Sequence, residues 1–219
     1  MKNGMNLILA SNSPRRRELL SLTELKFRVL PADVDETPLT GESASDYVRR
    51  LAASKAQTVG AQAGPDAFVL AADTTVVDGN QILGKPVDNE DAGQMLRQLR
   101  GRPHQVYTAI AFLRGDELLV DCCGTDVPMR DYSETEMQVY IESGDPLDKA
   151  GAYAIQHAGF HPVNGLTGCY ANVVGLPLCH LVRSLRKYDF DLIADVPQAC
   201  QATLGYDCPI YEAVLQERI

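Results

Sequence analysis

Apolar runs without a helical period mark the predicted strands. Such runs lie at 7–10, 27–30, 68–77 and 105–113, and the run at 68–77 gives the strongest strand signal. The turns Asp78-Gly79-Asn80 and Gly115-Asp116 lead into further predicted strands at 81–83 and 117–128. A late strand is predicted at 170–174.

Caps and apolar residues at helical spacing predict the helices. Pro14 suits the first position of a helix capped by the preceding serines and asparagine. Strands and helices intermix with hairpins, so the fold class is α/β with a mixed twisted sheet and flanking helices. Two further helices begin at capping boxes: one from Ser43, with Asp46 in the capping-box position, to about 62, and one from Ser133, with Glu136, to about 143. Two more are predicted from Asn89 to about 99 and from Gly175-Leu176-Pro177 to about 186.

The turn after the first strand concentrates cationic and hydroxyl groups. Ser11 and Ser13 precede the helix, and three arginines, Arg15, Arg16 and Arg17, fill its first turn. Arginine has the wrong sign for a helix N-terminus, which already carries partial positive charge. Free backbone N–H groups, hydroxyls and guanidinium groups together favour an anion such as a phosphate chain. The alternative is a solvated basic turn.

Two charged residues fall on positions that the pattern predicts to be buried. Asp73 interrupts the apolar run at 68–77, and a buried carboxylate must be paired, bound to metal or protonated. The simpler alternative is a break in the strand at Asp73. Lys55 lies on the apolar stripe of the helix that follows Ser43. It either extends from the edge of that stripe to water or reaches into a neighbouring cleft.

Composition and charge narrow the function classes. The 219 residues fit one domain or one domain with two lobes, and a net charge of −9 argues against a general nucleic-acid coat. No apolar run is long enough for a signal peptide or a membrane span, so we expect a cytoplasmic protein without a membrane partner. The six cysteines form no C-x-x-C pair and are expected to be buried thiols. Cys200 and Cys208 could pair or hold a metal, but their spacing matches no zinc pattern.

The candidate site residues together suit metal-assisted hydrolysis of a polyphosphate. Cations and a divalent metal would neutralise phosphate charge, and a carboxylate would orient or deprotonate water. No Gly-x-x-x-x-Gly-Lys-Ser/Thr motif occurs, so an ordinary ATPase or kinase architecture is unsupported. The candidate residues are the cations Arg15, Arg16, Lys55 and Lys85, the carboxylates Asp35, Glu36 and Asp73, and the hydroxyls Ser11, Ser13 and Thr74.

Six motifs in order resemble the Maf family of nucleoside triphosphate pyrophosphatases, which are linked to septum formation. Any one motif is weak, but six in the family's order, spanning residues 7 to about 185, are highly specific. The motifs are Ala10-Ser11-Asn12-Ser13-Pro14-Arg15-Arg16, Ala72-Asp73-Thr74, Gly84-Lys85-Pro86, His104-Gln105-Val106-Tyr107-Thr108, Asp148-Lys149-Ala150-Gly151-Ala152-Tyr153 with Ile155-Gln156, and Val174-Gly175-Leu176-Pro177-Leu178.

The resemblance implies a fold, a reaction and a metal. The fold would be two-lobed and similar to the inosine triphosphatases, with the nucleotide in the cleft between the lobes. The reaction would cleave between the α- and β-phosphates of a nucleoside triphosphate, with Mg or Mn as the divalent cation. A Maf-like domain at 1–187 would carry a C-terminal extension at 188–219, packed on the same domain, and the family often forms homodimers.

The resemblance also assigns roles by position. Asp73 corresponds to the proton acceptor, and Asp35 or Glu36 to the acidic residue of the metal site, which Asp73 shares. The phosphate contacts would be Ser11, Ser13, Arg16, Lys55 and Lys85, and the residues that set base preference would be Arg15, Thr74 and Gln156.

The base-preference residues are similar to the branch of the family that acts on dTTP and UTP, and modified pyrimidine triphosphates are further candidates. A glutamine amide offers both a donor and an acceptor to a pyrimidine edge. The alternatives are a 7-methylguanosine triphosphate pyrophosphatase, another purine enzyme, or a non-catalytic nucleotide-binding regulator of septum formation.

The chain departs from the family pattern at His157-Ala158, at Cys169 and in the long tail from about 188. These departures concern the rim of the base pocket and the dimer surface more than the chemistry. His104 is expected to have a structural role. Lys149 is expected to pair with Asp148 or with a site carboxylate, or else to contact phosphate.

Overall fold

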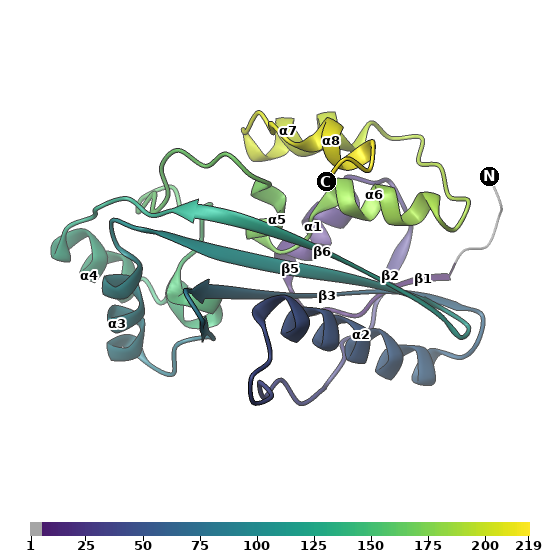
Figure 1. The fold of residues 1–219 in the computed structure, drawn as a ribbon, viewed down its shortest axis with the longest axis horizontal. Coiled ribbons are helices and arrows are strands. Elements are labelled where there is room, and N and C mark those ends of the chain that lie inside the picture. The colour runs from purple at the N-terminus through teal and green to yellow at the C-terminus, as the bar shows by residue number, and fades with distance from the viewer. Residues whose placement is uncertain (1–5) are drawn as a thin grey trace.

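A mixed sheet runs the length of the molecule, and helices cover both of its faces (Figure 1). The computed structural model describes residues 6–219. The strand order is β2-β1-β3-β5-β6, with β4 paired to β3; β1 is parallel to β2 and β3, and the other pairs are antiparallel. The strands are β1 (Asn6–Leu9), β2 (Phe27–Val29), β3 (Ala67–Asp78), β4 (Gln81–Leu83), β5 (Pro103–Arg114) and β6 (Glu117–Pro128).

The long helix α2 (Ala44–Ala63) covers one face of the sheet, and α1, α5 and α6 cover the other, with α7 and α8 against α6 (Figure 1). Helices α3 and α4 lie together at one end of the sheet. The remaining bounds are α1 (Pro14–Ser21), α3 (Asn89–Leu99), α4 (Glu134–Glu142), η1 (Asp145–Asp148), η2 (Ala150–Ala152), α5 (Tyr170–Val174), α6 (Leu178–Arg186), α7 (Val196–Leu204) and α8 (Tyr211–Leu215).

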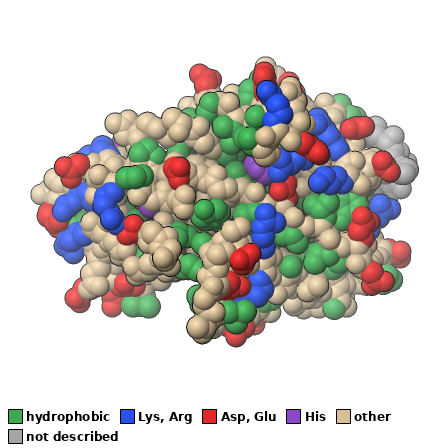
Figure 2. Space-filling model, in the orientation of Figure 1, with side chains coloured by type: hydrophobic (Ala, Val, Ile, Leu, Met, Phe, Trp, Pro, Cys, Tyr) green, Lys and Arg blue, Asp and Glu red, His purple; other side chains and the backbone are tan. Residues whose placement is uncertain are grey.

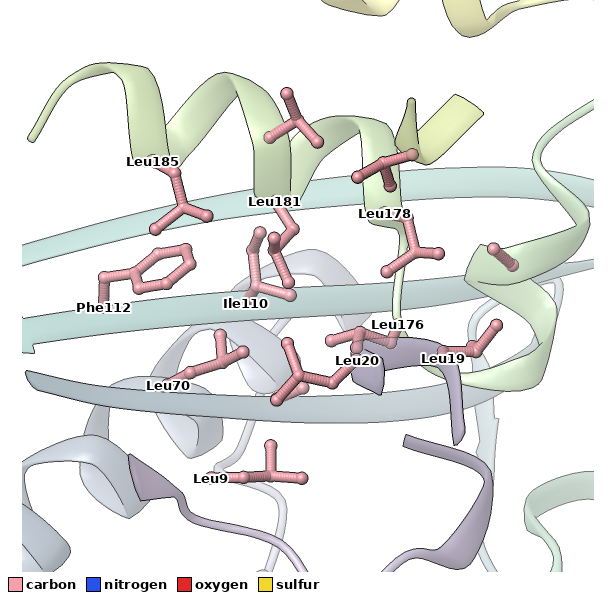
Figure 3. Close-up of a cluster of buried hydrophobic side chains, with 14 of the residues drawn as sticks. Leu9, Leu19, Leu20, Leu70, Ile110, Phe112, Leu176, Leu178, Leu181 and Leu185 are labelled. Atoms are coloured by element: carbon pink, nitrogen blue, oxygen red, sulfur yellow. The ribbon is translucent and has the colours of Figure 1, made fainter. Parts of the chain in front are cut away.

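Strand β3 is apolar at consecutive positions because helices bury both of its faces. Leu70 points toward α6, in the cluster that also contains Ile110, Phe112 and Leu181 (Figure 3). Its neighbour Val69 points the other way and packs against α2. The alternation of β-strand side chains thus explains why this run shows no polar face.

The same long strands enter a second core toward the end that carries α3 and α4. Val76 of β3, Val106 of β5 and Val127 of β6 are buried there with Leu96 of α3 and Tyr140 of α4. The predicted two-lobed α/β arrangement with a mixed sheet is therefore confirmed, and three strands are shared between the lobes.

Three details of the predicted secondary structure are wrong. The predicted late strand at 170–174 is the helix α5, because Cys169 Sγ caps the N–H of Asn172 and Gly175 ends the turn at φ 118°. Helix α3 is capped by Asp88 and not by Asn89. Strand β5 begins at Pro103, inside the predicted loop, because its register with β6 starts there.

The tail from 188 packs on α6. Val196 and Cys200 of α7 are buried in the same cluster as Leu178 of α6. Arg186 donates to the carbonyl of Leu215 at 3.1 Å. The division into 1–187 and 188–219 stays a prediction. Among residues 6–219, all six cysteines are free thiols, and no helix is long and apolar enough to cross a membrane.

Two buried histidines make stability depend on pH. Burial lowers the pKa of His104 and of His180 from 6.5 to about 4. Between these values the unfolded chain binds more protons, so we expect stability to be complete above pH 6.5 and to fall as the pH drops toward 4. The loss is at most about 1.4 kcal/mol per pH unit for each histidine.

Urea unfolding at pH 7.5 and pH 5.0 measures this loss. His180→Leu should flatten the pH dependence, because Nδ1 of His180 is buried with no hydrogen-bond partner in the part of the chain described here. His161→Asn, at an exposed position, serves as the control. If the free energy of unfolding falls equally between pH 7.5 and pH 5.0 in the wild type and in His180→Leu, the lowered pKa of His180 does not cause the loss of stability.

Candidate active site

The site lies at the carboxyl end of β1, next to a stretch of β3 that is unpaired on one side. The chain leaves β1 for β2 on one side and returns to β3 on the other, which makes the carboxyl end of β1 a topological switch point. Pairing of β3 with β1 ends at Leu70, and pairing with β4 begins at Val76. The intervening edge of β3, which includes Asp73 and Thr74, has no strand partner on that side within residues 6–219.

The loop after β1 is held by its own hydroxyls. Ser13 caps α1 by accepting from the N–H of Arg16 at 3.4 Å. Ser11 Oγ accepts from the N–H of Ser13 at 3.2 Å and from Arg16 at 3.3 Å. Ser13 and the first residues of α1 line the cavity described below, and the start of a helix suits an anion.

Arg16 is fixed by contacts from three segments. It donates to Ser11, to Thr74 Oγ1 at 2.9 Å and to the carbonyl of Gly175 at 2.9 Å. Burial lowers the pKa of Arg16, and the nearby Asp73 and Glu36 carboxylates oppose this shift. A guanidinium has five N–H groups, so Arg16 keeps donors for a ligand while its plane is held in place.

On the other face of β3, Lys55 lies between two carboxylates. Its Nζ is 2.5 Å from Asp73 Oδ1 and 2.6 Å from Glu36 Oε1. Asp73 is only 6% exposed, and burial raises its pKa although Lys55 and Arg16 act to lower it. Tyr47 of α2 donates to the backbone carbonyl of Glu36 at 2.8 Å, which fixes the acidic loop over this pair.

A cavity of about 180 Å³ opens beside Arg16 on the Thr74 face of the strand. Its walls combine cations with apolar side chains from both lobes. Figure 2 shows that charges of both signs are spread over one face of the molecule. The lining residues are Ser13, Arg15, Arg16, Thr74, Val76, Lys85, Val106, Asp148, Lys149, Ala150, Tyr153, Ala154, Ile155, Gln156, Val173 and Val174.

Lys149 lines the cavity and forms ion pairs with two aspartates. Its Nζ donates to Asp145 Oδ1 at 2.8 Å and to Asp148 Oδ1 at 2.5 Å. Arg15 approaches the other oxygen of Asp148 at 3.9 Å. Of the alternatives for Lys149, the pairing with Asp148 is the one present in the structure.

The structure brings most of the predicted site residues to one place. Six of them line the cavity: Ser13, Arg15, Arg16, Thr74, Lys85 and Gln156. Ser11 does not line it but accepts a hydrogen bond from Arg16. Lys85 and Gln156 are exposed, and Lys85 forms no ion pair within the described residues.

Lys55, Glu36 and Asp73 do not line the cavity but form their own cluster on the other face of β3. Asp35 and His104 belong to neither group. Asp35 is exposed and accepts from the N–H of Thr37 at 2.9 Å, so it does not join the cluster of Lys55 and Asp73. His104 is buried and hydrogen-bonds Tyr153 OH at 2.7 Å, which supports its structural role.

Sequence reasoning missed the residues behind the cavity wall. Thr108 contacts Thr74, and the carbonyl of Asn172 contacts Thr108. Thr108 lay in a recognised motif without an assigned role. Asn172 lies in the segment that was predicted to be a strand. A side-chain amide within an apolar run indicates that the amide is buried and hydrogen-bonded, and this signal could have identified Asn172.

The sequence of most of the chain decides its family. A profile described as "Maf-like protein" matches residues 6–188. The chain belongs to the Maf family. The dTTP/UTP pyrophosphatase of Myxococcus xanthus (strain DK1622) is 53% identical over 182 residues, which are 83% of this chain and 91% of that protein. The dTTP/UTP pyrophosphatase of Hahella chejuensis (strain KCTC 2396) is 45% identical over 191 residues, 86% of this chain and 95% of that protein.

Among solved structures, the Staphylococcus aureus Ham1 protein aligns over 67% of this Maf chain and 85% of its own chain. The sequence identity is 19% and the TM-score is 0.44. This likeness is weak, and the fold assignment rests on the strand order and pairing described above.

Proposed function

We propose that this Maf protein hydrolyses dTTP and UTP to the nucleoside monophosphate and pyrophosphate. The observation that carries the proposal is a buried carboxylate, Asp73, at a free strand edge whose opposite face borders a cavity lined by cations. The relatives named above, similar over most of their length, support the choice of dTTP and UTP.

The cations around the cleft suit a triphosphate chain. Arg16 and the serines of the β1–α1 loop offer N–H and O–H donors, and Lys85 is free to reach in from the exposed rim. Lys55 spans two carboxylates and can contact phosphate only by exchanging one of them. Phosphate oxygens accept hydrogen bonds and carry negative charge, which these donors match.

The residues present fit a divalent cation. Within residues 6–219 no three His, Cys, Asp or Glu side chains converge as a complete metal cage. Mg²⁺ needs only one or two carboxylates when substrate phosphates supply further oxygens. Asp73 and Glu36 would hold it after Lys55 Nζ, which lies 2.5 and 2.6 Å from them, has moved to the phosphates. Asp35 bonds the N–H of Thr37 and would not take part. When bound, such an ion would neutralise charge on the phosphates.

Asp73 is suited to accept a proton from water. In the proposed reaction the water oxygen bonds the α-phosphorus, the bond to the bridging oxygen breaks, and pyrophosphate leaves. The proton of the water passes to Asp73, and burial raises the pKa of this carboxyl. A base whose pKa lies nearer to the working pH drives proton transfer more effectively than an ordinary aspartate.

The first test is pyrophosphate release from a panel of nucleoside triphosphates with Mg²⁺ or Mn²⁺. We expect turnover of dTTP and UTP that a chelator abolishes, because the phosphate charges need the cation. The panel includes dCTP, purine triphosphates and 7-methylguanosine triphosphate, with the protein plus chelator as control.

The other outcomes separate the alternatives. Turnover of 7-methylguanosine triphosphate alone would keep the mechanism and overturn the proposed substrates. Binding of nucleotide without any release would favour a regulator. The cytoplasmic location, the homodimer and the absence of nucleic-acid partners stay predictions from the sequence.

A further inference from the structure

A group of cysteines lies where the tail from 188 packs against α5 and α6. Their side chains border one small cavity, which we call the thiol cavity: Cys169 before α5, Cys179 on α6, Cys200 on α7 and Cys208 between α7 and α8. The volume of the thiol cavity is about 10 Å³, no more than one water molecule needs, so the side chains around it lie close together. Cys200 and Cys208 lie beyond residue 188, where the match to the Maf-like profile ends. The proposed hydrolysis uses none of these residues.

Contacts of the tail hold Cys208 against the segment that carries Cys169. Tyr206 OH lies 2.9 Å from the carbonyl of Gly168, which joins the residue two before Cys208 to the residue before Cys169. The rings of Tyr170 and Tyr206 also pack together, with their centroids 5.5 Å apart. The two cysteines are therefore brought together by groups other than their own thiols.

Within the thiol cavity, Cys169 and Cys208 hydrogen-bond each other. That hydrogen bond and burial raise the pKa of Cys208. Cys179 and Cys200 interact with Cys208 only through charge. Cys208 is half-buried and the other three cysteines are buried, so Cys208 is the thiol of this group that a small reagent can reach from solvent.

Cys169 has a second thiol neighbour, Cys123 of β6, whose hydrogen bond raises the pKa of Cys169. Cys123 is only 4% exposed, and its Sγ lies 3.9 Å from the carbonyl of Gly124. An oxidant from solvent therefore meets Cys208 before Cys123, and a bond from Cys208 to Cys169 is the one that follows directly. No three Cys, His, Asp or Glu side chains of the described residues are grouped as metal ligands, the thiol cavity included.

Cys169 also connects the thiol cavity to the candidate active site. Its Sγ caps α5 by accepting from the N–H of Asn172 at 3.4 Å. The same short helix ends at Gly175, whose carbonyl accepts from Arg16 at 2.9 Å. A covalent bond at Cys169 would thus attach the tail to the helix that holds Arg16 in place.

We propose that Cys169 and Cys208 form a reversible disulfide by exchange with a small organic disulfide, and that this bond fastens the tail to α5. The inference goes beyond the proposed function and does not rest on it.

The exchange takes place in two steps. The Cys208 thiolate bonds one sulfur of the small disulfide, whose S–S bond breaks and releases one small thiolate. The Cys169 thiolate then bonds Cys208 Sγ and displaces the second small thiolate. The two protons of the cysteines end on the released thiols, so the cysteine pair loses two electrons and the small disulfide gains them.

The disulfide should stabilise the folded protein. Cys169 and Cys208 are 39 positions apart, so the bond would close a long loop and restrict the unfolded chain. We expect the midpoint of thermal unfolding to rise by about 5 °C or more. Because the pKa values of both thiols are raised, the rate of exchange should increase about tenfold for each pH unit from pH 7 to pH 9.

The test treats the full chain with 2-hydroxyethyl disulfide at pH 8.5. The remaining thiols are then alkylated in denaturant, and unreduced peptides are mapped by mass spectrometry. We expect a linked pair of peptides that contain Cys169 and Cys208, together with the rise in unfolding temperature, and dithiothreitol should reverse both. Cys208→Ser should lose both. Cys122→Ser should keep both, because Cys122 is a half-buried thiol on the α2 face of the sheet, away from the thiol cavity.

Three results would overturn the inference. The first is a mixed disulfide that persists at Cys208 while Cys169 remains open to alkylation. The second is a linked pair that joins Cys169 to Cys123, or Cys179 to Cys200. The third is the expected linked pair without any rise in unfolding temperature, because the bond would then not fasten the tail. Neither measurement depends on turnover, so a protein that cleaves no triphosphate can still confirm the disulfide while the proposed function falls.

Discussion

Replacing Asp73 with asparagine should lower pyrophosphate release from dTTP by about a thousandfold, in the range of a lost general base. The amide has nearly the shape of the carboxylate and keeps an oxygen for Lys55, which is 2.5 Å from Asp73 Oδ1. It cannot accept a proton from water at neutral pH. Steady-state rates with saturating metal measure the loss.

Glu36→Gln is the matched control for Asp73→Asn. Glu36 contacts the same Lys55 Nζ at 2.6 Å, but its side chain is 55% exposed against 9% for Asp73. We expect Glu36→Gln to raise the metal concentration needed for activity more than it lowers the maximal rate. Undiminished turnover in folded Asp73→Asn would remove Asp73 from the mechanism. Thermal unfolding with and without dTTP verifies that the variant is folded and binds.

Gly151→Ala should destabilise the protein by about 2 kcal/mol or more and weaken nucleotide binding with it. Gly151 has φ 69°, and a Cβ there would lie 2.8 Å from Val76 Cγ1 on β3. Both the backbone strain and the collision oppose the substitution. The N–H of Gly151 also donates to the carbonyl of Gly84 at 3.0 Å, beside Lys85. A displaced Gly151 would therefore move the rim residue Lys85.

A double-mutant cycle separates the two causes. Val76→Ala removes the side-chain atoms that the new Cβ would meet, so Gly151→Ala should cost less in that background than in the wild type. The remaining cost reports the strain of φ alone. Urea unfolding of the four proteins gives the coupling energy. Additive costs would show that the contact with Val76 is relieved by a small backbone shift.

Local chemistry made the strands and the burial of Lys55 and Asp73 predictable. The continuous apolar run of β3 indicated burial on both faces, and Asp73 within it indicated a carboxylate with a partner. Lys55 and Asp73 are both buried in the structure, where they form an ion pair. The extended strand continues through Asp73, so the alternative of a strand break there is wrong.

The residues that could not be predicted depend on contacts between distant segments. Thr108 and Asn172 are 64 positions apart, and only the packing of α5 against β5 shows that they bond. Residues 170–174 read as a strand because they are short and apolar, and the cap from the Cys169 thiol gave no usual helix signal. The contact of Lys55 with Glu36 and not with Asp35 likewise depends on the packing of distant segments.

The three long strands also restrict how the enzyme can move. Strands β3, β5 and β6 each span 12 residues and pass from one core into the other without interruption. A hinge between the lobes would have to bend this paired ribbon and break its ladder of hydrogen bonds, because hinges ordinarily use loops or element ends. The framework beneath the cavity is therefore expected to keep its shape whether or not a nucleotide is bound.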